Sequence, residues 1–287
     1  MLLPTRKDLA DSFFRMGISG FAYSEEEDMD ANAGLFDCLA AAEWTSKYIH
    51  HFGGSGNRIT AAGQSAGAGM LYYMSVLDGG EGVLPFQRMF VSSPAAPGRR
   101  DVSSRLKEQF GMVLEAANCS SIDCLRELPE DALVEVNDKI ISRTPTNSGG
   151  GMFGPVIGFG PVPDGGSIPD MPLALYQQGK FHDELEGVMV GSMAMEGMGT
   201  SHDTDLPEYF PIMVRQIMST ASNETVKEVQ EMYPFDPEFP ATLAWEWTTD
   251  VIFACNAYNL VQALPGKSRR YIMSTPPATH GQDLWCK

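Results

Sequence analysis

Residues 58–71 read RITAAGQSAGAGML, and this stretch is the most informative feature of the chain. A β-like run at 58–62 leads into the pentapeptide GQSAG at 63–67, and small residues that can open a helix follow it. A strand, a sharp turn and a helix in this order hold a serine, here Ser65, in a strained conformation at the tip of a sheet. The N–H of Ala66, at the helix start, would donate to an oxyanion formed by attack of Ser65. The alternative interpretation is an ordinary helix start with Ser65 as its N-cap.

The residues before this stretch form a longer pattern. Residues 32–44 read NAGLFDCLAAAEW and residues 49–60 read IHHFGGSGNRIT. With the pentapeptide they resemble the type-B carboxylesterase family, which includes cholinesterases and fungal lipases and reads N-x-G-L-x-D-Q-x-x-A-L-x-W, F-G-G-D-P-x-R-V-T and G-E-S-A-G. The chain departs at Cys38 in place of Gln, at 55–56 with Ser-Gly in place of Asp-Pro, and at Gln64 in place of Glu. None of these departures touches the serine.

The resemblance implies an α/β-hydrolase fold, which is a mostly parallel sheet with helices on both faces and helical cap insertions. The early strands of that fold are expected to be missing from this chain. The residues themselves point to the same class, because short apolar runs alternate with helical stretches, as is typical of parallel sheets. The runs lie at 58–62, 86–93, 188–192 and 270–274.

Two further elements are expected near the N-terminus. Residues 32–51 carry apolar side chains at helical spacing, which predicts a helix with Asn32 as its N-cap. Residues 14–21 resemble the family segment that ends an early strand of the sheet.

The whole chain, residues 1–287, is expected to form a single, partial α/β-hydrolase domain. Cap-like helical insertions are predicted at about 101–150 and 200–245, where amphipathic patterns occur at 105–118 and 225–232. In this fold such insertions cover the active site and shape its pocket.

Composition excludes some classes of partner. The formal net charge is −17, which argues against nucleic acid or an anionic membrane surface. No run of about 18 apolar residues occurs, so no transmembrane helix is expected, and the polar residues 1–8 do not resemble a signal peptide. No clustered His/Cys pattern predicts a metal site, and no cofactor is expected. The compartment and the oligomeric state stay open.

A serine hydroxyl needs an adjacent base, and the base needs an orienting acid. His280 lies in PPATHGQDL at 276–284, which resembles the family's P-P-A-x-H-G-x-D/E motif, where the histidine is the general base. Glu196 lies in GSMAMEG at 191–197, which resembles the family's G-x-x-x-x-E-G. The order Ser65, Glu196, His280 is the order of α/β hydrolases. For Glu196 the alternative is a solvated loop carboxylate.

The remaining candidates for the acid and the base fit less well. Asp203 and Asp205 are weaker alternatives for the acid. The other four histidines lie at a helix end or in polar loops, where a surface histidine is the usual interpretation; they are His50, His51, His182 and His202.

The resemblance also implies roles for four further residues, two near the site and two in the cap region. Ser93 and Asp283 resemble the family's buried hydrogen-bonding pair near the catalytic histidine, which would lock its geometry; for Ser93 the alternative is a strand-end turn. Cys119 and Cys124 resemble a family disulfide, the alternative being two free thiols. Methionines 152, 193, 195 and 198 are candidates for an apolar pocket or for core filler.

One part of the family's site has no counterpart in the sequence. The family takes further oxyanion donors from a glycine-rich loop before the segment that here begins at Phe14, and residues 1–13 contain no glycine. The chain also ends seven residues after His280, at Lys287. We therefore expect a chain that is truncated at both ends relative to the family, with weak catalysis.

Three functions stay open at this point. The first is a serine carboxylic-ester hydrolase that acts on a small-molecule ester through an acyl-enzyme at Ser65. The second is a catalytically impaired fragment or a non-catalytic binding member of the same fold. The third is a tailoring hydrolase of secondary metabolism, because the segment around His280 looks most like fungal members of the family.

Overall fold

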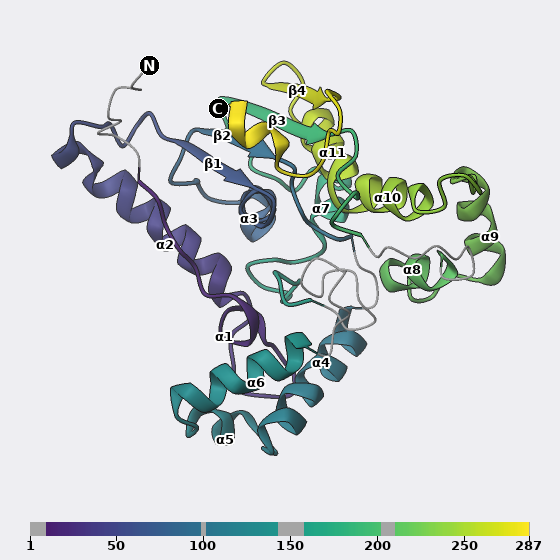
Figure 1. Cartoon of the computed structure of the whole chain (residues 1–287). Coiled ribbons are helices and arrows are strands. Elements are labelled where there is room, and N and C mark those ends of the chain that lie inside the picture. The colour runs from purple at the N-terminus through teal and green to yellow at the C-terminus, as the bar shows by residue number, and fades with distance from the viewer. Residues whose placement is uncertain (1–9, 99–101, 143–157, 202–209, 287) are drawn as a thin grey trace.

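The computed structural model describes residues 10–98, 102–142, 158–201 and 210–286 (Figure 1). Its centre is one parallel sheet in which the spatial order β1-β2-β3-β4 follows the order along the chain. The strands are β1 (Thr60–Gln64), β2 (Arg88–Ser92), β3 (Gly187–Met193) and β4 (Ser268–Met273). Each of the four strands overlaps an apolar run of the sequence, so the predicted α/β-hydrolase fold with a mostly parallel sheet is confirmed.

The strands are joined by helices of varied length. The first half of the described chain contains α1 (Gly17–Phe21), α2 (Ala33–Tyr48), η1 (Ile49–Phe52), α3 (Ala66–Met74), η2 (Leu77–Gly80), α4 (Val102–Ala117), α5 (Ile122–Arg126) and α6 (Glu130–Ser142). The second half contains α7 (Pro172–Gln177), α8 (Phe210–Ile217), α9 (Asn223–Met232), α10 (Thr242–Thr248), the π-helical η4 (Thr249–Ala254), α11 (Cys255–Ala263) and η5 (Gln282–Cys286).

The two faces of the sheet have different roles. Alternate strand residues such as Val91 and Val190 point into the main core, where α3, α7 and α11 pack against them. Burying a side chain of this size contributes about 1.5–3 kcal/mol. Ser92 points to the opposite face, where it bonds to Asp283 of η5. The main helices of the core therefore cover one face, and η5 lies on the other.

Two helical groups extend from the sheet, as Figure 1 shows. Helices α4, α5 and α6 share a small core around Phe110 and Val113, and α8, α9 and α10 share another around Phe210 and Trp247. The guanidinium of Arg105 on α4 donates to the backbone carbonyl oxygen of Arg215 on α8 at 2.7 Å. This bond ties the first group to the second.

The N-terminal part differs from the sequence-based expectation in two respects. Residues 17–21 form the short helix α1 rather than the end of a strand. Asn32 precedes α2 but does not cap it, because its φ is 64° and its side chain makes no bond to the helix. The Asn32 amide instead exchanges two hydrogen bonds with the backbone of Val162, at 2.9 and 2.8 Å. The predicted cap therefore holds a distant loop in place.

Candidate active site

Ser65 occupies the sharp turn between β1 and α3. Its φ of 56° and ψ of −120° place it outside the regions that a residue with a side chain normally adopts, a strain of about 1–3 kcal/mol. The turn is tight enough that a Cβ on Gly63 would lie 2.5 Å from the carbonyl carbon of Gly67. The Ser65 side chain makes no capping bond to α3, so the N-cap interpretation does not describe this turn.

The structure brings Ser65, His280 and Glu196 together into one hydrogen-bonded array. The Oγ of Ser65 lies 2.8 Å from Nε2 of His280. The Nδ1 of the same ring lies 2.6 Å from Oε2 of Glu196. Ser65 lies at the elbow after β1, Glu196 in the loop after β3, and His280 in the segment after β4. They meet at the carboxyl ends of parallel strands, the usual position of sites in such sheets.

Glu196 is held rigidly within this array. It is 0% exposed, so it is not a solvated loop carboxylate. Its Oε1 accepts a hydrogen bond of 2.7 Å from the backbone N–H of Met193, which leaves Oε2 for the imidazole. A carboxylate fixed in this way favours the imidazole tautomer with its proton on Nδ1 and the lone pair on Nε2, toward Ser65.

Two further residues contact the imidazole. The ring of Phe253, on η4, lies with its centroid 4.7 Å from that of His280. The side-chain amide nitrogen of Gln64 lies 3.2 Å from Nε2 of His280. Sequence reasoning noted Gln64 only as a departure from the family pattern and gave no signal for Phe253.

Asp283 belongs to a buried cluster beside the array. Its Oδ2 accepts hydrogen bonds from the Ser92 hydroxyl at 2.6 Å and from the Tyr271 hydroxyl at 2.5 Å. Burial, followed by the hydrogen bond to Asp283, raises the pKa of Tyr271 to about 12. No sequence pattern indicated this role of Tyr271. Its ring lies over Gly191, the first residue of the stretch GSMAMEG at 191–197.

Ser93 is the serine expected beside Asp283, but its neighbour Ser92 bonds to Asp283 instead. Ser93 is buried, but its Oγ forms no hydrogen bond to the described residues. Its backbone has left the strand, with a φ of 54°, and its N–H donates to the carbonyl of Gly191 at 2.8 Å. Ser92, the last residue of β2, is the serine whose hydroxyl bonds to Asp283.

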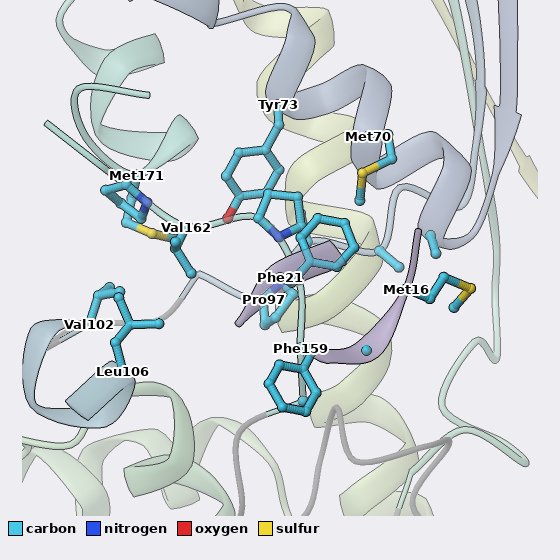
Figure 2. Close-up of a pocket in the computed structure, with 18 of the residues that line it drawn as sticks. Met16, Phe21, Met70, Tyr73, Pro97, Val102, Leu106, Phe159, Val162 and Met171 are labelled. Carbon is cyan, nitrogen blue, oxygen red and sulfur yellow. The ribbon is translucent and has the colours of Figure 1, made fainter. Parts of the chain in front are cut away.

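Ser65 and Ala66 also line a pocket with a volume of about 320 Å³ (Figure 2). The figure shows apolar side chains converging on it from several elements. They include Met16, Phe21, Met70, Val102, Leu106 and Phe159. Ala66 is the first residue of α3, so its N–H belongs to the helix end, where backbone donors have no partner within the helix.

The four methionines named as candidates for an apolar pocket or for core filler do not line this pocket where they are described. Met193 is buried in β3, and neither Met195 nor Met198 is part of the lining. Position 152 is not among the described residues. Met16, Met70 and Met171 line the pocket instead. These three methionines belong to segments that are far apart in the sequence, which is why no local pattern indicated them.

The other described sequence candidates take no part in the array. His50 and His51 are exposed on η1, and His182 is buried with its Nδ1 2.9 Å from Glu184. His202, Asp203 and Asp205 lie outside the described residues.

Cys119, two residues after the end of α4, and Cys124, within α5, form a disulfide with a Cα–Cα distance of 5.6 Å. The described part of the chain contains no group of three or more His, Cys, Asp or Glu side chains that could hold a metal ion. Within the same ranges, no helix has the length and apolar character needed to cross a membrane.

The parallel sheet with a strained serine elbow defines the chain as an α/β hydrolase. The sequence profile of the carboxylesterase family matches residues 11–279, and the chain belongs to that family.

Its similarity to individual proteins points the same way. The chain is 31% identical to carboxylesterase patB of Aspergillus clavatus over 288 residues, which cover 94% of the chain and 49% of that protein. It is 26% identical to a secreted lipase of Arthroderma benhamiae, over 88% of the chain and 48% of that protein. The crystal structure of Aspergillus niger EstA superposes with a TM-score of 0.79 at 25% identity, covering 94% of the chain and 56% of that structure. The chain thus spans about half the length of the curated relatives it matches.

Proposed function

We propose that this chain hydrolyses carboxylic esters, with Ser65 as nucleophile, His280 as general base and Glu196 as the acid that orients the base. The observation that carries the proposal is the continuous array, in which Ser65 Oγ lies 2.8 Å from Nε2 and Glu196 Oε2 lies 2.6 Å from Nδ1. Both distances are within the range of strong hydrogen bonds, and they support the roles of nucleophile, base and orienting group.

The chemistry follows from these positions. His280 Nε2 takes the hydroxyl proton as Ser65 Oγ attacks the ester carbonyl, and Glu196 stabilises the imidazolium that forms. The N–H of Ala66 donates to the oxyanion. When the tetrahedral intermediate collapses, the imidazolium returns its proton to the departing alkoxide, and the alcohol leaves. Water then attacks the acyl-enzyme by the same route, which releases the carboxylic acid and restores Ser65.

The pocket supports an apolar ester as substrate. Its described lining is dominated by methionine, aromatic and aliphatic side chains, which suit an alkyl or aryl group. Val102 and Leu106 of α4 form part of one wall, and this supports a cap-like role for the predicted insertion at 101–150. We therefore propose that the region around α4 shapes the selection of the acyl or alcohol group.

The test is hydrolysis of p-nitrophenyl butyrate by the full chain, compared with Ser65→Ala. The control is Ser103→Ala, an exposed serine on α4 that should leave turnover unchanged. Loss of turnover in Ser65→Ala alone supports the proposal. Equal turnover in all three proteins contradicts it and favours the alternative of a non-catalytic binding member of the same fold.

Labelling with a fluorophosphonate ester gives a second readout that does not require turnover. Such a reagent phosphonylates an activated serine and loses fluoride, and the modified peptide identifies the residue by mass. We expect label on the peptide that contains Ser65, and none in Ser65→Ala. Label spread over several serines, without preference for Ser65, would count against an activated nucleophile.

A further inference from the structure

Gln64 is the last residue of β1 and lies directly before the proposed nucleophile. Its side-chain amide nitrogen is 3.2 Å from Nε2 of His280. The same ring nitrogen is 2.8 Å from the Oγ of Ser65. The nitrogen that is proposed to act as the base therefore faces two groups that can donate a hydrogen bond.

This arrangement discriminates between the two protonation states of His280. A neutral imidazole with its proton on Nδ1 offers one lone pair on Nε2, which the Ser65 hydroxyl and the Gln64 amide share. An imidazolium carries a proton on Nε2, so the amide N–H of Gln64 would then face another donor until the amide turned to present its oxygen. A hydrogen bond made only to the neutral form favours that form.

We infer that Gln64 is a positioning residue that keeps His280 unprotonated at Nε2 and so extends the activity of the site toward acidic pH. This inference rests on the proposed function, because it concerns the base of the proposed triad. The resembling family pattern has a carboxylate at this position, and a negative charge there would favour the imidazolium instead.

The other groups around the imidazole do not replace Gln64 in this role. Glu196 holds Nδ1, and its charge favours the protonated ring. Phe253 of η4 contributes an uncharged ring. Asp283 of η5 is bonded to Ser92 and Tyr271. Since all of these stay the same when only position 64 is changed, a comparison of variants at this position isolates its effect.

The test is the pH dependence of kcat/KM for p-nitrophenyl butyrate in the wild type, Gln64→Glu and Gln64→Met. In Gln64→Glu we expect the acid limb to move to higher pH by about 1–2 units, because a carboxylate then lies within reach of the imidazolium. In Gln64→Met, which is close in shape but cannot donate, we expect a smaller upward shift of about 0.4–1 unit, the effect of losing one hydrogen bond. A purely structural role would lower the rates without moving the limb.

A second readout is the titration of His280 itself, followed by NMR of protein labelled with ¹⁵N at histidine and assigned with His280→Gln. The midpoint should rise in the same order, from wild type to Gln64→Met to Gln64→Glu. Equal midpoints in the three proteins, or a lower midpoint in Gln64→Glu, overturn the inference. If Gln64→Glu does not fold, the comparison of Gln64→Met with the wild type decides.

The failure of this inference differs from the failure of the proposed function. If Ser65→Ala abolishes turnover while the three proteins share one acid limb, the ester hydrolase stands and the role of Gln64 falls. If Ser65→Ala is as active as the wild type, the proposed function falls. The histidine titration then still decides whether Gln64 controls the protonation of His280.

Discussion

Gly191 and Tyr271 are register partners on β3 and β4, and the tyrosine ring occupies the space that a side chain at Gly191 would need. A Cβ on Gly191 would lie 2.0 Å from the ring carbon that bears the hydroxyl group. This close approach lets the hydroxyl reach Asp283 at 2.5 Å. Asp283 is three residues from His280, so one glycine on β3 determines how the segment that carries the proposed base is anchored.

We expect Gly191→Ala to destabilise the fold by about 1–3 kcal/mol, because the added methyl group overlaps the Tyr271 ring and forces it to move. The control is Gly187→Ala on the same strand and the same face, where a Cβ would meet nothing closer than 3.9 Å. Urea unfolding of both variants and the wild type measures the difference. Equal unfolding midpoints for the two variants would show that the ring has room to move.

The raised pKa of Tyr271 predicts a loss of stability in alkaline solution. Its pKa rises from 10.0 to about 12 on folding, so the folded state retains the phenolic proton more strongly than the unfolded chain. The stabilisation is present below about pH 10 and is lost as the pH rises toward 12. We expect the free energy of unfolding to fall less steeply between pH 9 and 11.5 in Tyr271→Phe than in the wild type. Parallel curves for the two proteins would contradict this assignment.

Glu196→Gln should lower kcat by about 10²–10⁴-fold while the protein stays folded. One glutamate oxygen accepts from Met193 N–H and the other from the imidazole. A glutamine has only one acceptor oxygen, so it must place an N–H against one of these donors. Glu186→Gln, an exposed acid before β3, is the control and should keep activity within about twofold. Activity of Glu196→Gln within tenfold of wild type would show that Glu196 does not orient the base.

Val102→Trp should restrict the pocket without touching the array. Val102 lies in the lining of a cavity of about 320 Å³, and the larger side chain would fill a substantial part of it. We expect kcat/KM for a p-nitrophenyl octanoate to fall by at least about tenfold, while the acetate changes by less than about threefold. Val134→Trp on α6, where the valine is 53% exposed, controls for the added indole. Equal losses on both esters would mean that Val102 acts on the fold rather than on selection.

The sequence was most informative where function depends on local geometry. The strand, the serine and the helix start are contiguous, so the turn at Ser65 could be predicted from the pattern. Glu196 and His280 were found through longer motifs that resemble those of the family. In the structure His280 bonds to Ser65, and Glu196 bonds to the other ring nitrogen of His280. Each strand of the sheet was also anticipated, because buried parallel strands are short apolar runs.

The prediction was weaker where a residue acts on a distant part of the chain. Asn32 is of a residue type that often caps helices, but its side-chain amide bonds to the backbone of Val162, 130 positions away. Ser92 and Ser93 are neighbours of the same residue type, and only the direction of each side chain in the structure shows that Ser92 reaches Asp283. Which strand residue reaches a distant partner depends on the face of the sheet to which its side chain points, and a shift of one residue along the strand reverses that face.

Local patterns of residue types thus predict the elbow and the strands, and Glu196 and His280 follow from longer motifs that resemble those of the family. The residues that surround them come together only in the folded chain. Gln64, Ser92, Gly191 and Tyr271 lie in one row across the four strands, in register. Gln64 contacts His280, Ser92 and Tyr271 bond to Asp283, and Gly191 leaves room for the Tyr271 ring. Their spacing in the sequence contains no trace of this row, because the register of parallel strands is set by packing across the whole sheet rather than by any one segment.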